Sequence, residues 1–129
     1  MTIRILRPEA SAGRSYVPGI VARGELVFVS GQIPVRDGRI VDVSIEAQVE
    51  AVLENIESIL RDAGASLDDV VRCGVFLADI EDLPRFNAVY ERAFGGRLPT
   101  RTTVGAMLPG YDVEIDCIAV LPDTRSDRH

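Results

Sequence analysis

The order of the predicted elements indicates an α+β fold, in which two helices cover one face of an antiparallel or mixed sheet. Two amphipathic helices stand out, and β-prone segments flank them in the order β-β-β-α-β-α-β-β, with short connections and no internal repeat. At 129 residues the chain has the length of one domain, which buries roughly two-thirds of its unfolded surface. We expect residues 1–121 to form this domain and residues 122–129 to be a polar tail.

The N-terminal third is predicted to be rich in strands. Ile3–Leu6 alternates weakly, and the runs Ile20–Ala22 and Leu26–Val29 flank a short glycine-containing loop that is typical of a hairpin. Asp37-Gly38 marks a further turn. Gly31 either adopts a backbone geometry that other residues avoid or allows another group to approach closely.

The clearest helix is predicted from Ser44 to Ala63. Ser44 is a natural N-cap, Glu46 places a negative charge near the positive end of the helix, and Gly64 is suited to the C′ position. Apolar residues recur at helical spacing and form one stripe that would pack on the sheet: Val49, Val52, Leu53, Ile56, Ile59, Leu60 and Ala63.

A strand over Val70–Ala78 precedes the second helix. Asp79–Asp82 and Pro84 mark the start of that helix, and Gly95-Gly96 ends it. Its apolar stripe consists of Leu83, Phe86, Val89, Tyr90 and Phe94. Asn87 lies in mid-helix, where asparagine is a poor helix former, so residue type alone predicts an exposed polar side chain.

The residue inventory excludes several kinds of site. All 14 basic residues are arginine, which excludes a lysine Schiff base, and the single histidine is the last residue, His129, which excludes Ser-His and Cys-His pairs. Cys73 and Cys117 have no CxxC spacing and are expected to be buried as small apolar residues. We therefore expect neither a metal nor a cofactor. Any acid–base catalysis must therefore use Asp, Glu, Cys or Tyr side chains.

Charge and hydropathy limit the classes of partner that the chain could bind. The net charge of −6 and the pI near 4.7 argue against a nucleic-acid binder, which normally presents a basic face. No apolar run approaches the roughly 20 residues that span a bilayer, and the first seven residues lack the long apolar core of a signal peptide. We expect no membrane association and a cytoplasmic location.

The segment Pro99–Leu121 places two charged residues on β-prone runs. Arg101 opens the first run, Glu114 lies inside the second, and Pro109-Gly110 between them predicts a hairpin turn. A guanidinium and a carboxylate on a rigid hairpin would suit the binding of a small carboxylate and the transfer of a proton. The alternative is two solvated charges on an exposed sheet face.

The predicted hairpin separates these two charges. A turn at residues 109–112 would pair Arg101 with Ala119–Val120 and Glu114 with Ala106–Met107, about five to six residues apart, or on the order of 16–20 Å. The turn register decides which face each side chain occupies. Because a three-carbon acid cannot bridge that span, we expect a site that uses both groups to take them from different chains.

Several segments together resemble the RidA family (also called YjgF, YER057c or UK114), whose characterised members are reactive-imine deaminases. The similarity extends from about Tyr16 to Val120, and the final segment is its most specific part. The matching segments are Tyr16-Val17-x-Gly19, Ser30-Gly31-Gln32-Ile33-Pro34, Gln48 through Asn55-Ile56, Val75-Phe76-Leu77 with Asp79, Asn87-Ala88-x-Tyr90, and Pro99-x-Arg101 through Leu108-Pro109 to Val113-Glu114-Ile115.

The resemblance implies a chorismate-mutase-like fold, a homotrimer, ligand clefts between subunits, and hydrolysis of substrates such as 2-aminoacrylate and 2-iminobutanoate to 2-keto acids and ammonia. By position, Arg101 would clasp the substrate carboxylate and Glu114 would orient or activate water. The cleft would be lined by Gly31, Tyr16, Asn87 and Thr103. A sheet covered on one face only also favours a trimer, since its second apolar face, with Val113, Ile115 and Cys117 or their alternating neighbours, would otherwise be exposed.

The chain departs from the family pattern at three places. Thr103 stands where the typical member has cysteine, and both the loop around residues 95–97 and the final hairpin are shorter than usual. These departures leave substrate size open. Alternatives to the small-imine enzyme are a deaminase for an aminomuconate-like dienoic acid and a non-catalytic module that binds a keto acid. An RNA-cleaving activity is the least favoured, given the acidic charge and the lack of an internal histidine.

Overall fold

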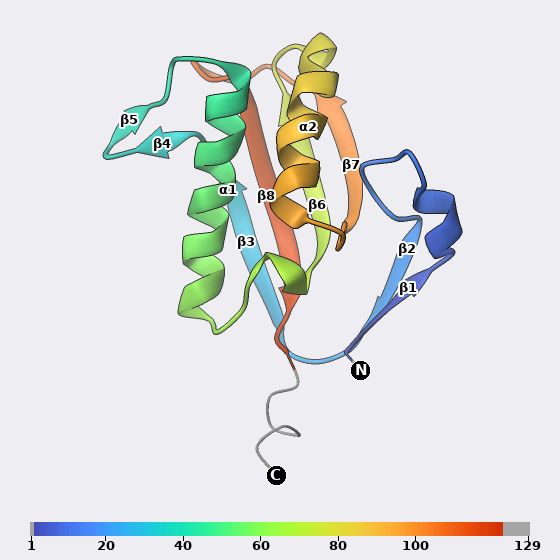
Figure 1. The fold of residues 1–129 in the computed structure, drawn as a ribbon. Helices are drawn as coiled ribbons and strands as arrows, with labels where there is room; N and C mark the ends of the chain where they lie inside the picture. The colour runs from blue at the N-terminus through green and yellow to red at the C-terminus, as the bar shows by residue number, and fades with distance from the viewer. Residues whose placement is uncertain (1, 123–129) are drawn as a thin grey trace.

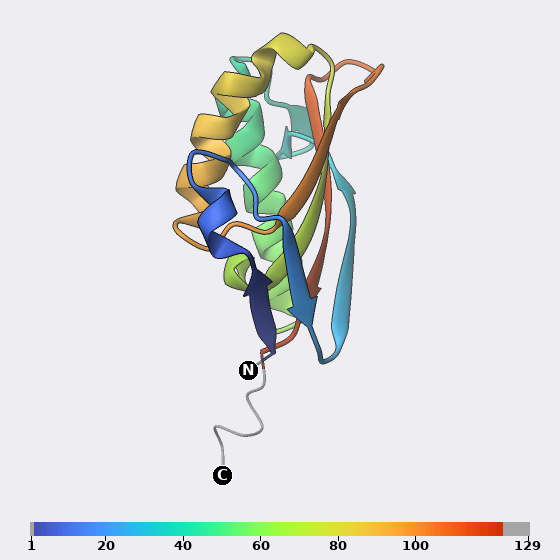
Figure 2. The ribbon, with the colours of Figure 1, turned by 90° about the vertical axis from the view of Figure 1, so that its right-hand side faces the viewer.

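The computed structural model describes residues 2–122, in which two α-helices cover one face of a four-stranded mixed sheet (Figures 1 and 2). This arrangement confirms the predicted α+β class. Most of the expected polar tail, residues 123–129, lies outside the described residues. The sheet consists of β3 (Leu26–Gln32), β6 (Val70–Leu77), β7 (Thr100–Gly105) and β8 (Val113–Val120), and the helices are α1 (Ile45–Asp62) and α2 (Leu83–Phe94). Two small hairpins pair β1 (Ile3–Leu6) with β2 (Gly19–Ala22) and β4 (Val35–Arg36) with β5 (Arg39–Ile40).

The two helices have the predicted bounds to within one or two residues. At the start of α1, the Ser44 side chain accepts a hydrogen bond from the Ala47 N–H at 3.1 Å, which satisfies one of the unpaired donors of the first turn. Gly64 follows the end of α1 with φ +83°, as expected of a C′ glycine. Apart from Ala63, which is exposed, the residues of the two predicted apolar stripes lie in the core or pack against it, and α1 packs on β3 and β8.

The strand order corrects the predicted C-terminal hairpin. The order is β3-β8-β6-β7, so β7 and β8 do not pair, and the connection of residues 106–112 crosses over the end of β6. Because α2 forms a crossover between β6 and β7, β7 runs parallel to β6 and occupies the sheet edge. β8 instead lies antiparallel between β3 and β6, where it forms hydrogen-bonded ladders on both sides.

The predicted N-terminal hairpin is also wrong. β2 pairs with β1, whereas β3 pairs with β8 at the opposite edge of the sheet (Figure 1). β8 offers β3 a long partner, and the Leu121 N–H donates to the Glu25 carbonyl at 2.9 Å just before β3 begins. The β1–β2 hairpin lies beside the β7 edge, where the Val17 N–H donates to the Pro99 carbonyl at 3.2 Å.

Alternation along β8 decides which side chains face the helices. Val113, Ile115 and Cys117 are buried beneath the helices, so the alternating neighbours Glu114, Asp116 and Ile118 lie on the uncovered face. Phe28 pairs with Ile118 on that face and is 70% exposed. The second face of the sheet is therefore partly apolar. Of the two sets that the sequence left open for this face, it carries the alternating neighbours and not Val113, Ile115 and Cys117.

The two cysteines behave as small apolar residues, as predicted. Cys73 and Cys117 are cross-strand partners on β6 and β8, and both are free thiols on the buried face. Burial raises the pKa of Cys73 to about 11 and that of Cys117 to about 12, so both thiols remain protonated near neutral pH.

We expect Gln48→Leu to lower the free energy of unfolding by about 1–3 kcal/mol, although it keeps the side-chain volume. Gln48 is 2% exposed on α1, and its Oε1 accepts a hydrogen bond from the Asp112 N–H at 2.8 Å, just before β8. The leucine would leave that N–H without a partner. Urea denaturation measures the change, with Glu50→Leu on the exposed side of α1 as the control. Equal stabilities of the two variants would contradict this role.

Candidate functional site

Arg101 projects from β7 into a set of aromatic side chains on the helix-covered face. Its register partner is Cys73, which is buried on that face, so the Arg101 side chain leaves the sheet in the same direction. The guanidinium carbon lies 4.9 Å from the ring centroid of Tyr90, 5.4 Å from that of Phe86 and 5.8 Å from that of Tyr16. These distances are within the range of cation–π attraction. We call Tyr16, Phe86 and Tyr90 the aromatic cage of Arg101.

The charge of Arg101 has no protein partner in the part of the chain that the structure describes. No carboxylate among residues 2–122 lies within 4.0 Å of its guanidinium, and its buried Nη1 has no hydrogen-bond acceptor. Burial lowers the pKa of Arg101, which reflects the cost of removing the cation from water. An anion bound at Nη1 would offset that cost.

The loop after β1 brings Tyr16 to Arg101. The hydroxyl of Ser15, which is buried, donates to the Glu91 carboxylate of α2, and Arg14 Nη1 donates to the Tyr16 hydroxyl oxygen at 3.1 Å. These contacts hold the loop against α2 and fix the position of the Tyr16 ring beside the guanidinium.

Asn87 and Thr103 contribute two more polar atoms without partners. Asn87 directly follows Phe86 on α2, and Thr103 lies two residues beyond Arg101 on the same face of β7. Asn87 Oδ1 and Thr103 Oγ1 are buried and have no hydrogen-bond partner. Asn87 is therefore half-buried rather than exposed, contrary to the expectation from residue type alone.

Glu114 forms a second group, on the uncovered face of the sheet. Its Oε1 accepts a hydrogen bond from the Tyr111 hydroxyl at 3.1 Å. The pKa of Tyr111 is raised, first by desolvation and second by this hydrogen bond. A bulge in β3 between Val29 and Gln32 places Gly31 against the same carboxylate. A Cβ at Gly31 would overlap Glu114 Oε2 and lie 2.9 Å from its Cδ. Gly31 thus permits a close approach and does not require a positive φ.

One chain keeps the two groups apart. Tyr16, Asn87, Arg101 and Thr103 lie on the helix-covered side, whereas Glu114 and Gly31 lie on the other. Arg101 is in register with Cys73, and Glu114 with Phe76. The predicted partners, Ala119–Val120 for Arg101 and Ala106–Met107 for Glu114, are therefore wrong. The separation arises from opposite sheet faces and not from hairpin length.

Phe86, Tyr90 and Tyr111 were not predicted as site residues. Helical spacing identified Phe86 and Tyr90 as part of an apolar stripe, and Tyr90 also belongs to a segment that matches the family, but neither was assigned a role in a site. A signal was present, because a βαβ unit packs its helix across the strand that follows, which brings the α2 stripe near Arg101. Tyr111 lies in the turn region, where spacing carries no such information.

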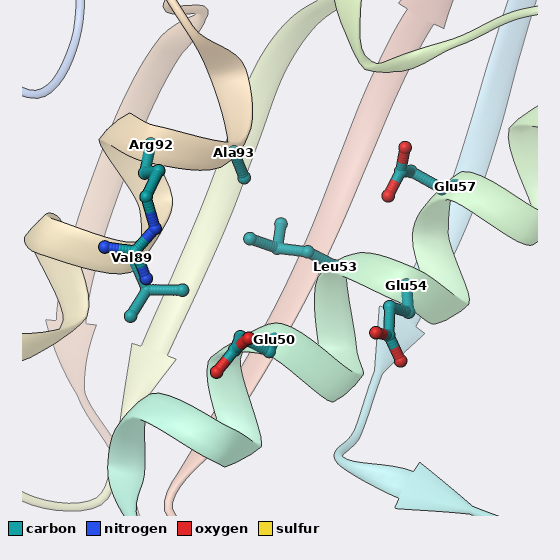
Figure 3. A pocket seen from close by; sticks show the side chains of 7 residues that line it. All are labelled: Glu50, Leu53, Glu54, Glu57, Val89, Arg92 and Ala93. Atoms are coloured by element: carbon teal, nitrogen blue, oxygen red, sulfur yellow. The ribbon is translucent and has the colours of Figure 1, made fainter.

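Two further hollows lie on the surface outside the surroundings of Arg101. A groove of about 210 Å³ lies between α1 and α2 and is lined by Glu50, Leu53, Glu54, Glu57, Val89, Arg92 and Ala93, none of which was predicted to belong to a site (Figure 3). A hollow of about 340 Å³ on the uncovered face includes Gly31 and Phe28. Within residues 2–122, no helix is long and apolar enough to cross a membrane, and no cluster of three or more His, Cys, Asp or Glu residues could hold a metal ion.

Comparisons with known proteins agree on one family. The family model described as endoribonuclease L-PSP matches residues 6–121. The mitochondrial protein mmf2 of Schizosaccharomyces pombe is 41% identical over 104 residues, which cover 77% of this chain and 82% of that protein. Because this relative is named as mitochondrial, the cytoplasmic location stays a prediction.

Two solved structures have the same fold. YyfB of Yersinia pestis, from the conserved Rid protein family, superimposes with a TM-score of 0.84 at 26% identity, covering 94% of this chain and all of that chain. TdcF of Escherichia coli, solved with bound serine, has a TM-score of 0.71 at 38% identity and covers 83% of this chain and 88% of that chain.

We expect Gly31→Ala to fold normally but to displace the Glu114 carboxylate, because the new methyl group would occupy its place. The Tyr111 hydroxyl would lose its acceptor, so the pKa of Tyr111 should fall toward the ordinary tyrosine value. Titration of the Tyr111 ring carbon by NMR measures the change. Gly96→Ala, where no atom lies near the added methyl group, is the control. An unchanged Tyr111 titration in Gly31→Ala would contradict the predicted overlap.

Proposed function

Because the chain belongs to the endoribonuclease L-PSP family, which includes the Rid and YjgF proteins, we propose that it hydrolyses small 2-imino acids to 2-keto acids and ammonia. The substrates would be of the 2-aminoacrylate or 2-iminobutanoate type. The observation that carries the proposal is the partly buried guanidinium of Arg101, which has no anionic partner among residues 2–122.

The Arg101 side of the site fits a small α-substituted carboxylate. A guanidinium offers a planar fork that pairs with the two oxygens of a carboxylate and keeps its charge at any physiological pH. Asn87 Oδ1 and Thr103 Oγ1 add polar atoms that a neighbouring imine or amine nitrogen would satisfy. The serine bound to TdcF is a ligand of this class, since it carries a carboxylate and an amine on the same carbon.

The Glu114 side of the site fits the movement of protons. Imine hydrolysis requires water at an already electrophilic carbon and protons at the departing nitrogen, and one carboxylate serves both steps. Glu114 Oε1 is held by the Tyr111 hydroxyl, and the absent side chain of Gly31 leaves its Oε2 free of overlap. In this proposal Glu114 orients the water and Tyr111 orients Glu114.

A complete site requires a second copy of the chain. Arg101 and Glu114 lie on opposite faces of one sheet, and a three-carbon acid cannot contact both through the packed core. The uncovered face bears Glu114 and the exposed ring of Phe28, so it offers an apolar surface on which a neighbouring chain would pack. We propose a homotrimer in which Arg101 of one subunit and Glu114 of the next form each site.

A keto-acid-binding module is the second candidate function. The Arg101 side contains the guanidinium that would bind a carboxylate, whereas Glu114, the residue proposed to move protons, lies on the opposite face of the sheet. A binder and an enzyme differ in their dependence on Glu114. If Glu114→Gln keeps the affinity for 2-oxobutanoate but abolishes ammonia release, the site is catalytic. If the wild type binds 2-oxobutanoate and releases no ammonia from 2-iminobutanoate, the binding module is favoured.

We expect Arg101→Lys to lose activity by about tenfold or more, although the substitution keeps the positive charge. An ammonium cannot form the two parallel hydrogen bonds of the guanidinium. Ammonia release from 2-iminobutanoate generated in situ measures the loss. Arg92→Lys, at an exposed position of α2, is the matched control. Wild-type kinetics in Arg101→Lys would exclude Arg101 as the carboxylate-binding residue.

We expect co-expressed Arg101→Ala and Glu114→Ala chains to regain activity in mixed trimers. In a cyclic trimer of both chains, one of the three interfaces combines an intact Arg101 with an intact Glu114, so about a third of the wild-type activity should return. Native mass spectrometry checks the composition of the assemblies. Mixing Glu114→Ala chains with the double variant is the control, because no interface is then intact. Inactive mixed trimers, or a stable monomer, would refute the intersubunit site.

A further inference from the structure

We propose that Phe86 and Tyr90 are positioning residues that hold the guanidinium of Arg101 in a desolvated, fixed orientation before the ligand arrives. The identity of the ligand, a small carboxylate, rests on the function proposed above. The inference goes beyond that function because it assigns the orientation of the arginine to two uncharged core residues, neither of which the sequence identified as a site residue.

The two rings form one continuous aromatic surface. Phe86 and Tyr90 lie one turn apart on α2, their centroids are 5.2 Å apart, and their planes meet at 29°. Both side chains are fully buried, at 0% exposure, so packing restricts their rotamers. The guanidinium carbon lies 5.4 Å and 4.9 Å from the two centroids. Arg101 therefore lies against a rigid surface and not against mobile side chains.

The rings replace the counter-ion that Arg101 lacks. A partly buried guanidinium without a carboxylate would normally turn toward solvent, since removing it from water is costly. Attraction to the negative ring faces offsets part of that cost and leaves the N–H groups unused. Nη1 remains buried and without an acceptor, as expected for a donor that is kept available for a ligand. An ion pair in the same place would have consumed these donors.

Tyr90 acts through its ring and not through its hydroxyl. The hydroxyl is buried without a good hydrogen-bond partner, beside the thiol of Cys73, and burial raises the pKa of Tyr90 above its ordinary value. The phenol therefore stays neutral and takes no part in proton transfer. This distinction predicts that Tyr90→Phe retains the function of the cage, whereas Tyr90→Leu loses it.

The chain supplies a matched control in Phe94. This residue lies one turn beyond Tyr90 on the same helix, is 3% exposed and packs on the Tyr90 ring at 4.7 Å, but its ring is not among those over Arg101. Phe94→Leu and Phe86→Leu remove the same atoms from the same core. A purely structural role for Phe86 would make the two variants alike in every measurement.

The first test measures the affinity for 2-oxobutanoate by calorimetry, together with the thermal midpoint of each variant. We expect Phe86→Leu and Tyr90→Leu to raise Kd about tenfold, a change that lies between the sizes of an exposed and a fully desolvated cation–π contact. Tyr90→Phe should stay within about twofold of the wild type, and Phe94→Leu should lower the midpoint as Phe86→Leu does while keeping the wild-type Kd. With an imine substrate, the cage variants should raise KM and leave kcat unchanged, since the carboxylate contact exists in both ground and transition states.

The second test needs no ligand. The NMR signal of the Arg101 Nε–H, assigned by its loss in Arg101→Lys, should be shifted upfield by the ring currents of the cage and protected from exchange with water. Phe86→Leu should move it toward the position of an exposed arginine, and Phe94→Leu should not. A wild-type Nε–H at the exposed position, or equal shifts and equal Kd values in the two leucine variants, would overturn the proposal.

These outcomes separate the cage from the enzymatic function. If the wild type releases no ammonia but binds 2-oxobutanoate through Arg101 and Phe86, the deaminase proposal fails and the cage stands. If ammonia is released and the Phe86→Leu and Phe94→Leu variants are indistinguishable, the cage fails and the deaminase proposal stands. If 2-oxobutanoate does not bind at all, the Nε–H signal alone decides whether Phe86 and Tyr90 position Arg101.

Discussion

The insertion of β8 between β3 and β6 is the constraint on which the rest of the arrangement depends. β3 and β6 run parallel to each other, and β8 fills the gap between them in the antiparallel direction, with a ladder on each side. Its alternation then sends Ile115 and Cys117 into the helix-covered core and Glu114 to the opposite face. β7 is left at the edge beside β6, where Arg101 has the helix α2 above it. Both functional groups therefore owe their positions to the path of one strand.

Unsatisfied polar atoms are concentrated around Arg101. Two polar side chains of α1 are paired: the buried Gln48 accepts from the Asp112 N–H, and the half-buried Asn55 amide donates to the carbonyls of Ile33 and Val35 at 3.1 Å and 3.0 Å. Such pairing is the rule in folded proteins, and exceptions call for an explanation. In the described part of the chain, the buried side-chain atoms without partners are Asn87 Oδ1, Tyr90 OH, Arg101 Nη1 and Thr103 Oγ1. A ligand that bears both a carboxylate and a polar nitrogen would satisfy Arg101 Nη1, Asn87 Oδ1 and Thr103 Oγ1, whereas the Tyr90 hydroxyl lies beside the Cys73 thiol.

The two sheet faces divide the work of the proposed site. In the proposal, the helix-covered side would bind the anion at Arg101, which packs against buried rings, and the uncovered side would provide the Glu114 carboxylate on a surface that exposes Phe28. Separation keeps Glu114 from neutralising Arg101 within one chain, so the cation stays available for an external carboxylate. Assembly of several copies would then complete the site and cover the apolar surface in the same step. Catalysis and oligomerisation would thus depend on the same residues.

The sequence by itself determined the elements and the chemical inventory. Caps and apolar spacing predict α1 and α2 correctly because local hydrogen bonds and one-sided burial are properties of short segments, as Ser44 and Gly64 show. The family motif identifies Arg101 and Glu114 as candidates, and the absence of lysine limits the chemistry. Only the tertiary structure decided the strand order, because a Pro-Gly turn signals a reversal of the chain but not which strand the returning segment joins. The tertiary structure also decided which face of the sheet each side chain occupies, since this depends on the pairing of β8 with β3 and β6, which are distant in the sequence. The contact of Arg101 with Phe86 and Tyr90, the two cage residues on α2, follows from that choice, because the apolar stripe of α2 covers Arg101 only when β7 lies beneath it.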